Sequence, residues 1–243
     1  MENEKVFDRV EKKYLITPQQ QTVILDVIRE HMEEDGYFKS GVFNIYFDND
    51  NFDLIIQSVD HPIFKEKLRA RSYEGYDKVF FEIKTKLMGP DANVGYKRRV
   101  LVNHKDYDDL VKHRAKMVEL AKRNMEARVD IQIAKEIDYF MEHFGLKPKI
   151  LVYYGRESYV GENGLRITFD TDLKYRTRNL NFTKKARDKT YFKDERNVIM
   201  EIKAGGALPL WLVHTLSAER IYPQRFSKIG KIYERIRKEN KNV

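Results

Sequence analysis

Eight stretches of this chain alternate with a period of two, and in several of them one face is apolar while the other is charged. A period of two is typical of β-strands, because successive side chains of a strand point to opposite faces of a sheet. The stretches lie at about 6–16, 42–48, 64–73, 79–86, 95–102, 149–160, 165–172 and 197–204. The chain is therefore expected to be built around a sheet whose apolar face is covered.

Helical signals occupy the stretches between these strands. The run Thr17-Pro18-Gln19-Gln20 fits a capping box with proline at the first helical position, which predicts a helix to about Glu34. Residues 103 or 104 to about 144 are predicted as a long helical region, or two helices in sequence, closed by Gly145 and Pro148. Two shorter helices are expected at 208–221 and 227–238, and a long polar loop at 173–196. The mixture of strands and helices predicts an α+β fold.

The composition excludes several classes of protein. The chain has 243 residues and no cysteine, which suits one domain over 1–243 without a disulfide, thiolate metal site or catalytic cysteine. Its first residues form no apolar signal segment, and the longest uncharged run, 204–218, is shorter than the roughly 20 apolar residues that span a bilayer. We therefore expect a soluble, cytoplasmic chain without a membrane span. A net charge of +8 favours an anionic partner.

The charged faces of the strands carry more cations than acids, and arginine is frequent among them. Two arrangements explain the pattern, and the pattern leaves both open. In the first, the charged face is the solvated side of an antiparallel sheet that packs on helices. In the second, the strands close into a barrel with the charge inside, which forms a polar tunnel. The cations are Arg9, Lys13, Lys65, Lys67, Arg69, Arg71, Lys84, Lys86, Lys97, Arg99, Arg156, Arg166 and Lys203, and the acids are Glu11, Asp48, Glu82, Asp170, Asp172 and Glu201.

The run Lys67-Leu68-Arg69-Ala70-Arg71 concentrates positive charge on one strand face. Alternate residues of a strand lie about 6.6–7 Å apart, a spacing that can clamp successive phosphates of a chain. Crowded cations repel one another unless an anion lies between them. The alternative is an exposed basic edge strand, which discourages aggregation.

Two Glu-x-Lys pairs, Glu82-x-Lys84 and Glu201-x-Lys203, each place an acid and a base on one strand face. Each pair can form a salt bridge within its own strand. Alternatively, the carboxylate binds a divalent metal and the lysine binds a phosphate oxygen. Glutamates suit hard cations such as Mg²⁺ or Mn²⁺, which retain water and substrate oxygens as further ligands.

The run Arg225-Phe226-Ser227-Lys228 opens the last predicted helix. Ser227 is a candidate N-cap, which we favour, and the same geometry can offer backbone N–H groups and cations to an anion. The histidines at 31, 61, 104, 113, 143 and 214 show no metal-ligand spacing. Because no glycine-rich phosphate loop occurs in the sequence, a nucleotide would be held by side chains.

An ordered set of short motifs gives the chain a resemblance to a known family. The motifs are Arg9-x-Glu11-x-Lys13-Tyr14, Asn44-x-Tyr46-Phe47-Asp48, Lys67-x-Arg69-x-Arg71, Phe81-Glu82-x-Lys84-x-Lys86, Lys97-x-Arg99, Tyr153-Tyr154-x-Arg156, Arg166-x-Thr168-Phe169-Asp170, Glu201-x-Lys203 and Arg225-Phe226-Ser227-Lys228. With this set, nearly the whole chain resembles the catalytic domain of the vacuolar transporter chaperone (VTC) proteins. These are polyphosphate polymerases within the triphosphate tunnel metalloenzyme (CYTH-like) superfamily.

The resemblance implies a fold, a reaction and a set of ligands. The fold would be an antiparallel eight-stranded β-barrel tunnel with a charged interior and helices packed outside. The reaction would transfer the γ-phosphate of ATP onto a growing polyphosphate chain that starts on inorganic phosphate or pyrophosphate, with Mn²⁺ or Mg²⁺ as the metal. The implied metal ligand is Glu201, with Glu11 as a second candidate that we favour instead as a partner of Lys13 or Arg9.

The same resemblance assigns phosphate contacts residue by residue. The candidate catalytic residues that hold phosphates are Lys13, Arg69, Arg71, Lys84, Lys97 and Arg156. The further candidate phosphate- or nucleotide-binding residues are Tyr154, Arg166, Lys203, Arg225, Ser227, Lys228, Lys67 and Arg99.

The chain departs from the hydrolytic members of that superfamily at two places. Those members carry Glu-x-Glu pairs in the first and last strands, whereas here the pairs are Arg9-x-Glu11 and Glu201-x-Lys203. This favours a polymerase over a hydrolase of tripolyphosphate or nucleoside triphosphate, which stays an alternative together with a non-catalytic polyphosphate binder. Nucleic acid is not expected as a partner, because the aromatics near the basic strands form no evident stacking platform. The phosphate-sensing (SPX-like) and transmembrane domains of the eukaryotic relatives are not expected, and the sequence does not determine an oligomeric state.

Overall fold

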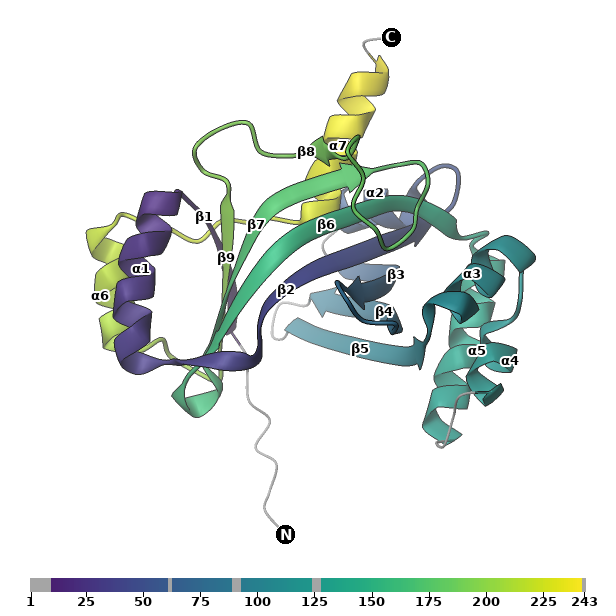
Figure 1. Ribbon diagram of the computed structural model, residues 1–243, viewed down its shortest axis with the longest axis horizontal. Coiled ribbons are helices and arrows are strands. Elements are labelled where there is room, and N and C mark those ends of the chain that lie inside the picture. Colours follow the sequence, from purple (N-terminus) through teal and green to yellow (C-terminus); the bar gives the residue numbers. More distant parts are fainter. Residues whose placement is uncertain (1–9, 61–62, 89–92, 124–127, 242–243) are drawn as a thin grey trace. The chain divides into compact units, whose positions relative to one another are not determined.

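The computed structural model describes residues 10–60, 63–88, 93–123 and 128–241 (Figure 1). The chain divides into two compact units, and each is built from separate segments of the sequence. The first unit comprises the chain up to Gly41 together with 154–174 and 190–226. The second unit comprises 42–153, 175–189 and the chain from Ser227 onward.

All eight predicted strands are present, and they are joined by one additional short strand. The elements in chain order are β1 (Val10–Ile16), α1 (Pro18–His31), β2 (Glu33–Asp48), α2 (Asp53–Asp60), β3 (Phe64–Tyr73), β4 (Val79–Met88), β5 (Asn93–Val102), α3 (His104–His113), α4 (Met117–Arg123), α5 (Arg128–His143), β6 (Lys147–Val160), the 3-10 turn η1 (Glu162–Gly164), β7 (Arg166–Arg176), β8 (Lys189–Thr190), β9 (Val198–Ala204), α6 (Leu210–Ala218) and α7 (Lys228–Lys241). Residues 6–9, which the sequence assigns to the first strand, lie outside the described residues.

The strands follow the hydrogen-bonded order β1-β9-β7-β6-β2-β3-β4-β5, and β8 pairs with β7. The pairings of β1 with β9, β7 with β9, β2 with β3, β3 with β4 and β4 with β5 are antiparallel. The order ends at β1 and β5, and no pairing between these two strands closes it in the described part of the chain. The antiparallel sheet with helices is therefore confirmed, whereas the closed eight-stranded barrel is not.

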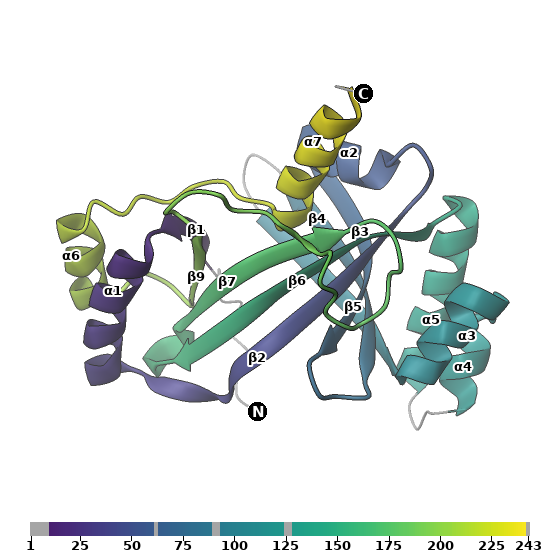
Figure 2. The same cartoon turned by 45° about the horizontal axis from the view of Figure 1, so that its top comes forward.

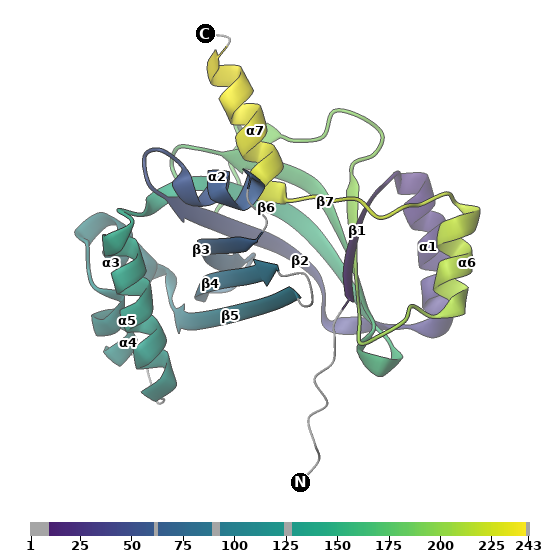
Figure 3. The ribbon, with the colours of Figure 1, turned by 180° about the vertical axis from the view of Figure 1, so that it is seen from behind.

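The core of the first unit lies between its strands and two helices. The apolar faces of β1, β7 and β9 pack against α1 and α6, which lie side by side (Figure 3). Because side chains alternate along a strand, burying this face leaves the charged face of the same strands on the other side. The fully or nearly fully buried residues include Tyr14, Ile16, Ile24, Ile28, Ile167, Phe169, Met200, Ile202 and Leu212.

The second unit follows the same rule with different helices. The apolar faces of β2 to β5 are buried in a cluster that includes residues of α3, α4 and α5, and α4 and α5 contact β5 (Figure 2). The side chains at its centre include Phe47, Leu68, Phe81, Ile83, Val100, Tyr107, Met117 and Leu120. In the same unit, α2 and α7 lie against each other (Figure 3).

The predicted capping box at the start of α1 is confirmed. The Gln20 amide donates to the Thr17 hydroxyl at 3.2 Å, and the Thr17 amide donates to the Gln20 side chain at 3.0 Å. The helix ends at His31 rather than near Glu34, because Met32 is extended and its side chain is buried, and β2 follows at once. The first half of β2 is mostly polar and exposed, so it lacks the apolar alternation that identifies a strand.

Among its described residues, the predicted long helical region at 103–144 contains three helices rather than one or two. The first, α3, ends where Arg114 adopts a left-handed conformation with φ of 56°. The carboxylate of Asp138 in α5 accepts hydrogen bonds from the Met117 and Val118 amides at 2.7 and 2.9 Å, which caps the start of α4. Gly145, with φ of 62°, follows α5 as predicted.

Helix α2 was not predicted from the sequence. Its start is held by Asp48, whose buried carboxylate accepts hydrogen bonds from the Leu54 and Ile55 amides at 3.1 and 2.9 Å. Burial raises the pKa of Asp48, and these backbone hydrogen bonds oppose that rise. The sequence placed Asp48 on the charged face as an acid, whereas the structure uses it to cap a helix.

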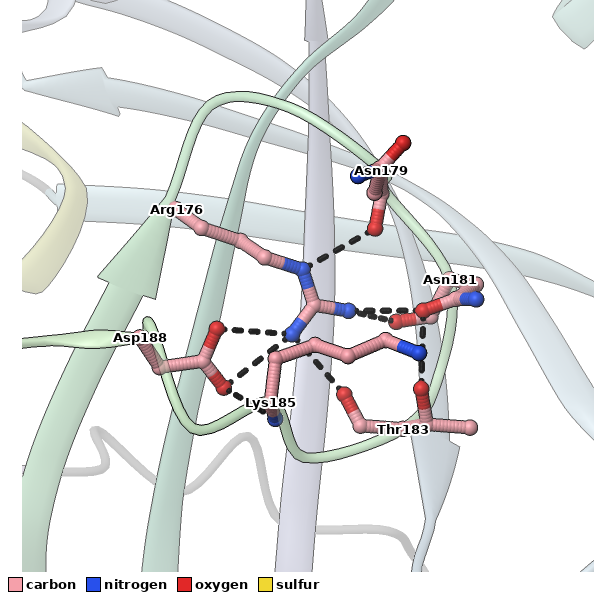
Figure 4. Close-up of polar contacts among 6 residues, drawn as sticks. All are labelled: Arg176, Asn179, Asn181, Thr183, Lys185 and Asp188. Carbon is pink, nitrogen blue, oxygen red and sulfur yellow. Dashed lines mark hydrogen bonds and ion pairs between the residues drawn. The ribbon is translucent and has the colours of Figure 1, made fainter.

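The polar segment that the sequence predicted as a loop is organised by a single buried arginine, Arg176, at the end of β7 (Figure 4). Its guanidinium donates to the backbone carbonyls of Asn179, Asn181 and Thr183 at 2.9, 2.6 and 2.8 Å. It also bonds the carboxylate of Asp188 at 2.9 Å, and only 8% and 2% of these two side chains are exposed. The planar guanidinium therefore fixes both ends and the middle of the segment 177–188.

We expect Arg176→Ala to loosen this segment without unfolding the rest of the chain. Loss of even one hydrogen bond to a charged group, worth about 1.5 kcal/mol, makes local opening about tenfold more frequent. Limited trypsin digestion should then cleave within 177–189 at least about tenfold faster, while the global unfolding midpoint changes little. Arg178→Ala removes an exposed arginine of the same segment, and trypsin should cleave this variant at the remaining sites as fast as it cleaves the wild type. Equal rates of trypsin cleavage in Arg176→Ala and Arg178→Ala would contradict the role of Arg176.

Candidate functional site

The register of the second unit aligns three lysines directly across three strands. Lys67 of β3 lies opposite Lys84 of β4, and Lys84 lies opposite Lys97 of β5. Directly opposed residues project from the same face of a sheet, about 4.5–5.5 Å apart, and like charges in such positions are destabilising. We call these residues the lysine row. Its mutual repulsion falls when an anion binds above it.

A second row lies next to the lysine row on the same face. Arg69 of β3 lies opposite Glu82 of β4, which in turn lies opposite Arg99 of β5. Arg71 begins a third row, where its Nε donates to the Asn44 side chain at 2.9 Å. The guanidinium of Arg99 lies 4.9 Å from the centre of the Phe80 ring. Six residues of the predicted phosphate site are thus brought together on one face, and these are Lys67, Arg69, Arg71, Lys84, Lys97 and Arg99.

Arg69 and Glu82 form a buried ion pair within this face. The Nε and Nη2 atoms of Arg69 lie 2.6 and 2.5 Å from the same Glu82 oxygen, and their side chains are 7% and 3% exposed. Burial alone would raise the pKa of Glu82, but the charges of Arg69, Arg71 and Lys84 outweigh it and lower that pKa to about 2. Lys97 is a more distant partner, with its Nζ 3.8 Å from the other Glu82 oxygen.

Glu82 makes the stability of the chain sensitive to acid. Because the pKa of Glu82 is about 2 in the folded chain against an ordinary value of 4.5, its contribution is complete above about pH 4.5 and is lost between about pH 4.5 and 2. The shift corresponds to about 3 kcal/mol. Urea unfolding of wild type and Glu82→Gln is measured from pH 7 to 2.5. The difference between their free energies of unfolding should shrink as the pH falls below about 4.5. Asp108→Asn, which alters an exposed pair, is the control, and a constant difference for Glu82→Gln would contradict the assignment.

The surroundings of Lys97 weaken its protonation. Partial burial lowers the pKa of Lys97, and the nearby arginines lower it further, while the carboxylate of Glu82 opposes both effects. Its side chain is still 49% exposed, so an anion can reach its ammonium group. An anion bound at the row would raise that pKa and strengthen the positive charge.

In the first unit the register pairs opposite charges instead. Lys13 of β1 lies opposite Glu201 of β9, and Glu11 lies opposite Lys203. The Lys13 ammonium lies 3.2 Å from Glu11 and 3.8 Å from Glu201, and the Lys203 ammonium lies 2.9 Å from Glu201 and 3.8 Å from Glu11. We call these four residues the mixed-charge cluster. The expectation that Glu11 serves as a partner of Lys13 agrees with this geometry, and Arg9 lies outside the described residues.

Glu201 is the least exposed member of the mixed-charge cluster. Its side chain is 12% exposed, against 48% for Glu11, 29% for Lys13 and 46% for Lys203. The backbone amide of Gln224 donates to the Lys13 carbonyl at 2.7 Å. This bond places the start of the Arg225 motif beside β1.

Arg156 of β6 is held by a buried carboxylate that the sequence placed on the charged face without assigning it a role. The Nε and Nη2 atoms of Arg156 lie 2.6 and 2.8 Å from the two oxygens of Asp170, whose side chain is fully buried. The guanidinium also lies 5.3 Å from the centre of the Tyr154 ring. Burial would lower the pKa of Arg156, but Tyr154, Asp170 and Glu201 raise it well above its ordinary value. The bidentate contact fixes the guanidinium plane and leaves its remaining N–H groups for other acceptors.

The other predicted residues fall into different surroundings. Arg166 lies opposite Lys203 in the register and forms an ion pair with Asp35 at 2.5 Å. Ser227 caps α7, since its hydroxyl accepts from the Gly230 amide at 3.3 Å, which agrees with the favoured prediction. Lys228 is the first residue of α7, and Ser227 and Lys228 belong to the second unit.

The acidic residues present fit a divalent ion only in combination with substrate oxygens. Among the described residues, no group of three or more His, Asp or Glu side chains is arranged to hold a metal ion. The mixed-charge cluster offers two carboxylates, both already in contact with lysines. Mg²⁺ and similar ions are commonly bound by one or two carboxylates plus substrate phosphates and water. Glu201, together with substrate oxygens, fits an ion of that kind and not a site built from protein ligands alone. Glu11, which contacts Lys13 and Lys203, remains the second candidate ligand.

Comparison with known proteins identifies a family that matches the chain and a protein similar to it. The VTC domain family matches residues 8–235. Subunit 4 of the vacuolar transporter chaperone complex of Schizosaccharomyces pombe is 25% identical over 187 residues, which are 69% of this chain and 26% of that protein. This chain thus spans about a quarter of the length of that relative.

A solved structure shares the fold. The putative adenylyl cyclase HpAC1 from Hippeastrum, described as having a dominant triphosphatase activity, superposes with a TM-score of 0.54 over 90% of this chain and 92% of its own, at 15% identity. At that identity the likeness concerns the fold. Within the described residues, none of the helices is both long and apolar enough to span a membrane. The match over nearly the whole chain leads to one conclusion: this chain belongs to the VTC domain family.

Proposed function

We propose that the chain is a metal-dependent polyphosphate polymerase. It transfers the γ-phosphate of ATP onto a growing inorganic polyphosphate chain, in the basic tunnel that the family resemblance implies. Membership of the VTC domain family supports phosphoryl-transfer chemistry of this kind. The observation that carries the proposal is the lysine row, flanked by Arg69 and Arg71 on the same face.

The lysine row suits a chain of phosphates better than it suits a protein ligand or water. Three ammonium groups across neighbouring strands, with guanidinium groups one row away, repel one another, and the carboxylate of Glu82 in the next row offsets part of that repulsion. Phosphate groups carry up to several charges in a small volume and repeat along a polymer. The free energy released when such a polymer neutralises the row contributes directly to its binding.

The same cations serve the chemical step. A terminal oxygen of the polyphosphate acceptor attacks the γ-phosphorus of ATP, a new P–O–P bond forms, and the bond to the β-phosphate oxygen breaks to release ADP. No protein nucleophile is needed, because phosphoryl transfer depends on positioning and on stabilising charge. Lys84, Lys97 and Arg71 would stabilise negative charge on the phosphate oxygens, and Arg156 would orient a phosphate through the N–H groups that Asp170 leaves available.

Glu201 is the residue that would hold a Mn²⁺ or Mg²⁺ ion, together with substrate oxygens. Such an ion, when bound, neutralises charge on the phosphates and orients them. Lys13 and Lys203 contact the same carboxylate, so they would exchange glutamate oxygens for phosphate oxygens as the charged ligand arrives.

A hydrolase of tripolyphosphate or nucleoside triphosphate is the second candidate. It is favoured by the triphosphatase activity named for the Hippeastrum protein of the same fold and by the presence of two carboxylates in the mixed-charge cluster. In that case water replaces the polyphosphate acceptor and attacks the terminal phosphorus. Orthophosphate is then released together with pyrophosphate from tripolyphosphate, or with the nucleoside diphosphate from a nucleoside triphosphate, and no polymer forms. The lysine row would have the same binding role in both reactions.

The test is to incubate the purified chain with ATP and Mn²⁺, with and without pyrophosphate, and to separate the products on a gel. A polyphosphate ladder supports the polymerase, and orthophosphate without polymer supports the hydrolase. If neither product forms but tripolyphosphate binds tightly, the chain is a binding module and both enzymatic proposals fail.

Binding to the lysine row has its own test. We expect Lys84→Gln to weaken tripolyphosphate binding about tenfold, the loss of one hydrogen bond to a charged group. The stability should change little, because the mutation removes the repulsion from Lys67 and Lys97 together with the attraction to Glu82. Lys105→Gln, which alters an exposed lysine on α3, is the matched control and should bind like the wild type. Calorimetric titration at fixed salt measures both, and equal affinities would remove the lysine row from the site.

A further inference from the structure

Among the described residues of the first unit, one buried threonine hydroxyl has no hydrogen-bond partner. The Oγ1 atom of Thr168, in β7, is buried and makes no hydrogen bond within the described part of the chain. The residue as a whole is 6% exposed. An unsatisfied buried hydroxyl costs about 1–3 kcal/mol, so native structures rarely retain one without a ligand or water for it.

The register places this hydroxyl next to the mixed-charge cluster. Thr168 lies directly opposite Glu201 of β9, and Glu201 lies directly opposite Lys13 of β1. The three side chains therefore project from the same face in one row. The neighbours of Thr168 along the strand, Ile167 and Phe169, are fully buried in the apolar core on the other side.

Packing alone does not explain the hydroxyl. Valine has nearly the same shape as threonine, is at least as favourable in a strand, and would leave no polar atom unsatisfied. The hydroxyl is therefore the one part of this side chain that costs stability and has no hydrogen-bond partner among the residues that the structure describes. Its residue lies directly opposite Glu201, to which the proposed function assigns the metal.

We infer that the Thr168 hydroxyl binds the ligand of this site by donating a hydrogen bond to a phosphate oxygen of an inorganic di- or triphosphate group. This inference rests on the proposed function and adds a binding residue to it. Neighbouring side chains cover the hydroxyl, so a phosphate reaches it when one of them turns aside. In the same row, the Lys13 ammonium group can exchange Glu11 and Glu201 for oxygens of that phosphate.

The test compares three variants on the same strand. Thr168→Val removes the hydroxyl and keeps the shape of the side chain, and Thr168→Ser keeps the hydroxyl. Thr171→Val is the control, because it removes a hydroxyl from the opposite face of the same strand. Tripolyphosphate affinity is measured by calorimetry in the presence of Mn²⁺, and the unfolding temperature is measured without either ligand. We expect Thr168→Val to bind about tenfold or more weakly, with Thr168→Ser and Thr171→Val within about twofold of the wild type.

The unfolding temperature separates a binding role from a structural one. Removing an unsatisfied hydroxyl should leave the unfolding temperature of Thr168→Val equal to or above that of the wild type. A variant that unfolds at a lower temperature and binds tripolyphosphate normally would show that the hydroxyl is structural, which overturns the inference alone. A wild-type chain that does not bind tripolyphosphate overturns the proposed function and the inference with it.

Discussion

Arg69→Ala is expected to lower the free energy of unfolding by about 3–5 kcal/mol, because it leaves the carboxylate of Glu82 buried without its main partner. That carboxylate is 3% exposed, and both Arg69 contacts to it are 2.6 Å or shorter. Arg71→Ala, two residues further along the same face, is expected to cost less, about 1–2 kcal/mol. It removes a hydrogen bond to the neutral Asn44 side chain and one of the charges that stabilise Glu82, while Arg69 stays in contact with that carboxylate.

Urea unfolding of the two variants measures this difference directly. A third variant, Arg69→Met with Glu82→Leu, replaces the buried pair with apolar side chains and should recover most of the stability, because no unpaired charge is then buried. Tripolyphosphate affinity should fall more in Arg71→Ala than in Arg69→Ala, although Arg71→Ala is the more stable of the two variants. Equal destabilisation by Arg69→Ala and Arg71→Ala would show that the buried ion pair is not what distinguishes them.

These expectations revise the role of Arg69 in the candidate site. The sequence treats Arg69 and Arg71 alike, as alternate residues of a basic strand. In the structure, Arg69 has one edge of its guanidinium committed to Glu82, whereas Arg71 contacts a neutral amide. We therefore assign Arg69 chiefly to holding the face together and propose Arg71 as the stronger phosphate contact of the two.

Glu201→Gln is expected to reduce the rate of phosphoryl transfer by at least about 100-fold. A metal ion at a transferring phosphoryl group stabilises the transition state by several kcal/mol, and each 1.36 kcal/mol is a factor of ten. The amide of glutamine keeps the size of the side chain but is a poor ligand for a divalent ion. Polymer formation from ATP, followed as a function of Mn²⁺ concentration, measures the rate and the apparent metal affinity together.

Glu11→Gln is the matched control in the same cluster. Its side chain is 48% exposed, and exposed ion pairs contribute about 0–1 kcal/mol, so we expect a loss of less than about fivefold. An unchanged unfolding midpoint in both variants excludes a folding defect. Full activity in Glu201→Gln would remove Glu201 from the metal assignment, and equal large losses in both variants would make Glu11 a second ligand.

The strands and their two faces were predictable because they depend on neighbours along the chain. A period of two in 64–73 or 79–86 assigns each side chain to a face without any knowledge of the partner strand. For the same reason the capping box at Thr17 and the N-cap at Ser227 were predictable, since each joins residues three apart. Helix α2 was not predicted, because its cap comes from Asp48 at the end of a strand.

Contacts between residues that are far apart in the sequence were decided only by the tertiary structure. The lysine row requires the register of three strands, and a shift of one residue in any pairing would turn one of its lysines to the apolar face. The partners Arg69 and Glu82, or Arg156 and Asp170, are each set by a pairing across strands rather than by a local spacing. The sequence by itself therefore determined the chemistry of each face, whereas the cross-strand register determined which charges meet, because register depends on the buried packing and turns of the whole sheet.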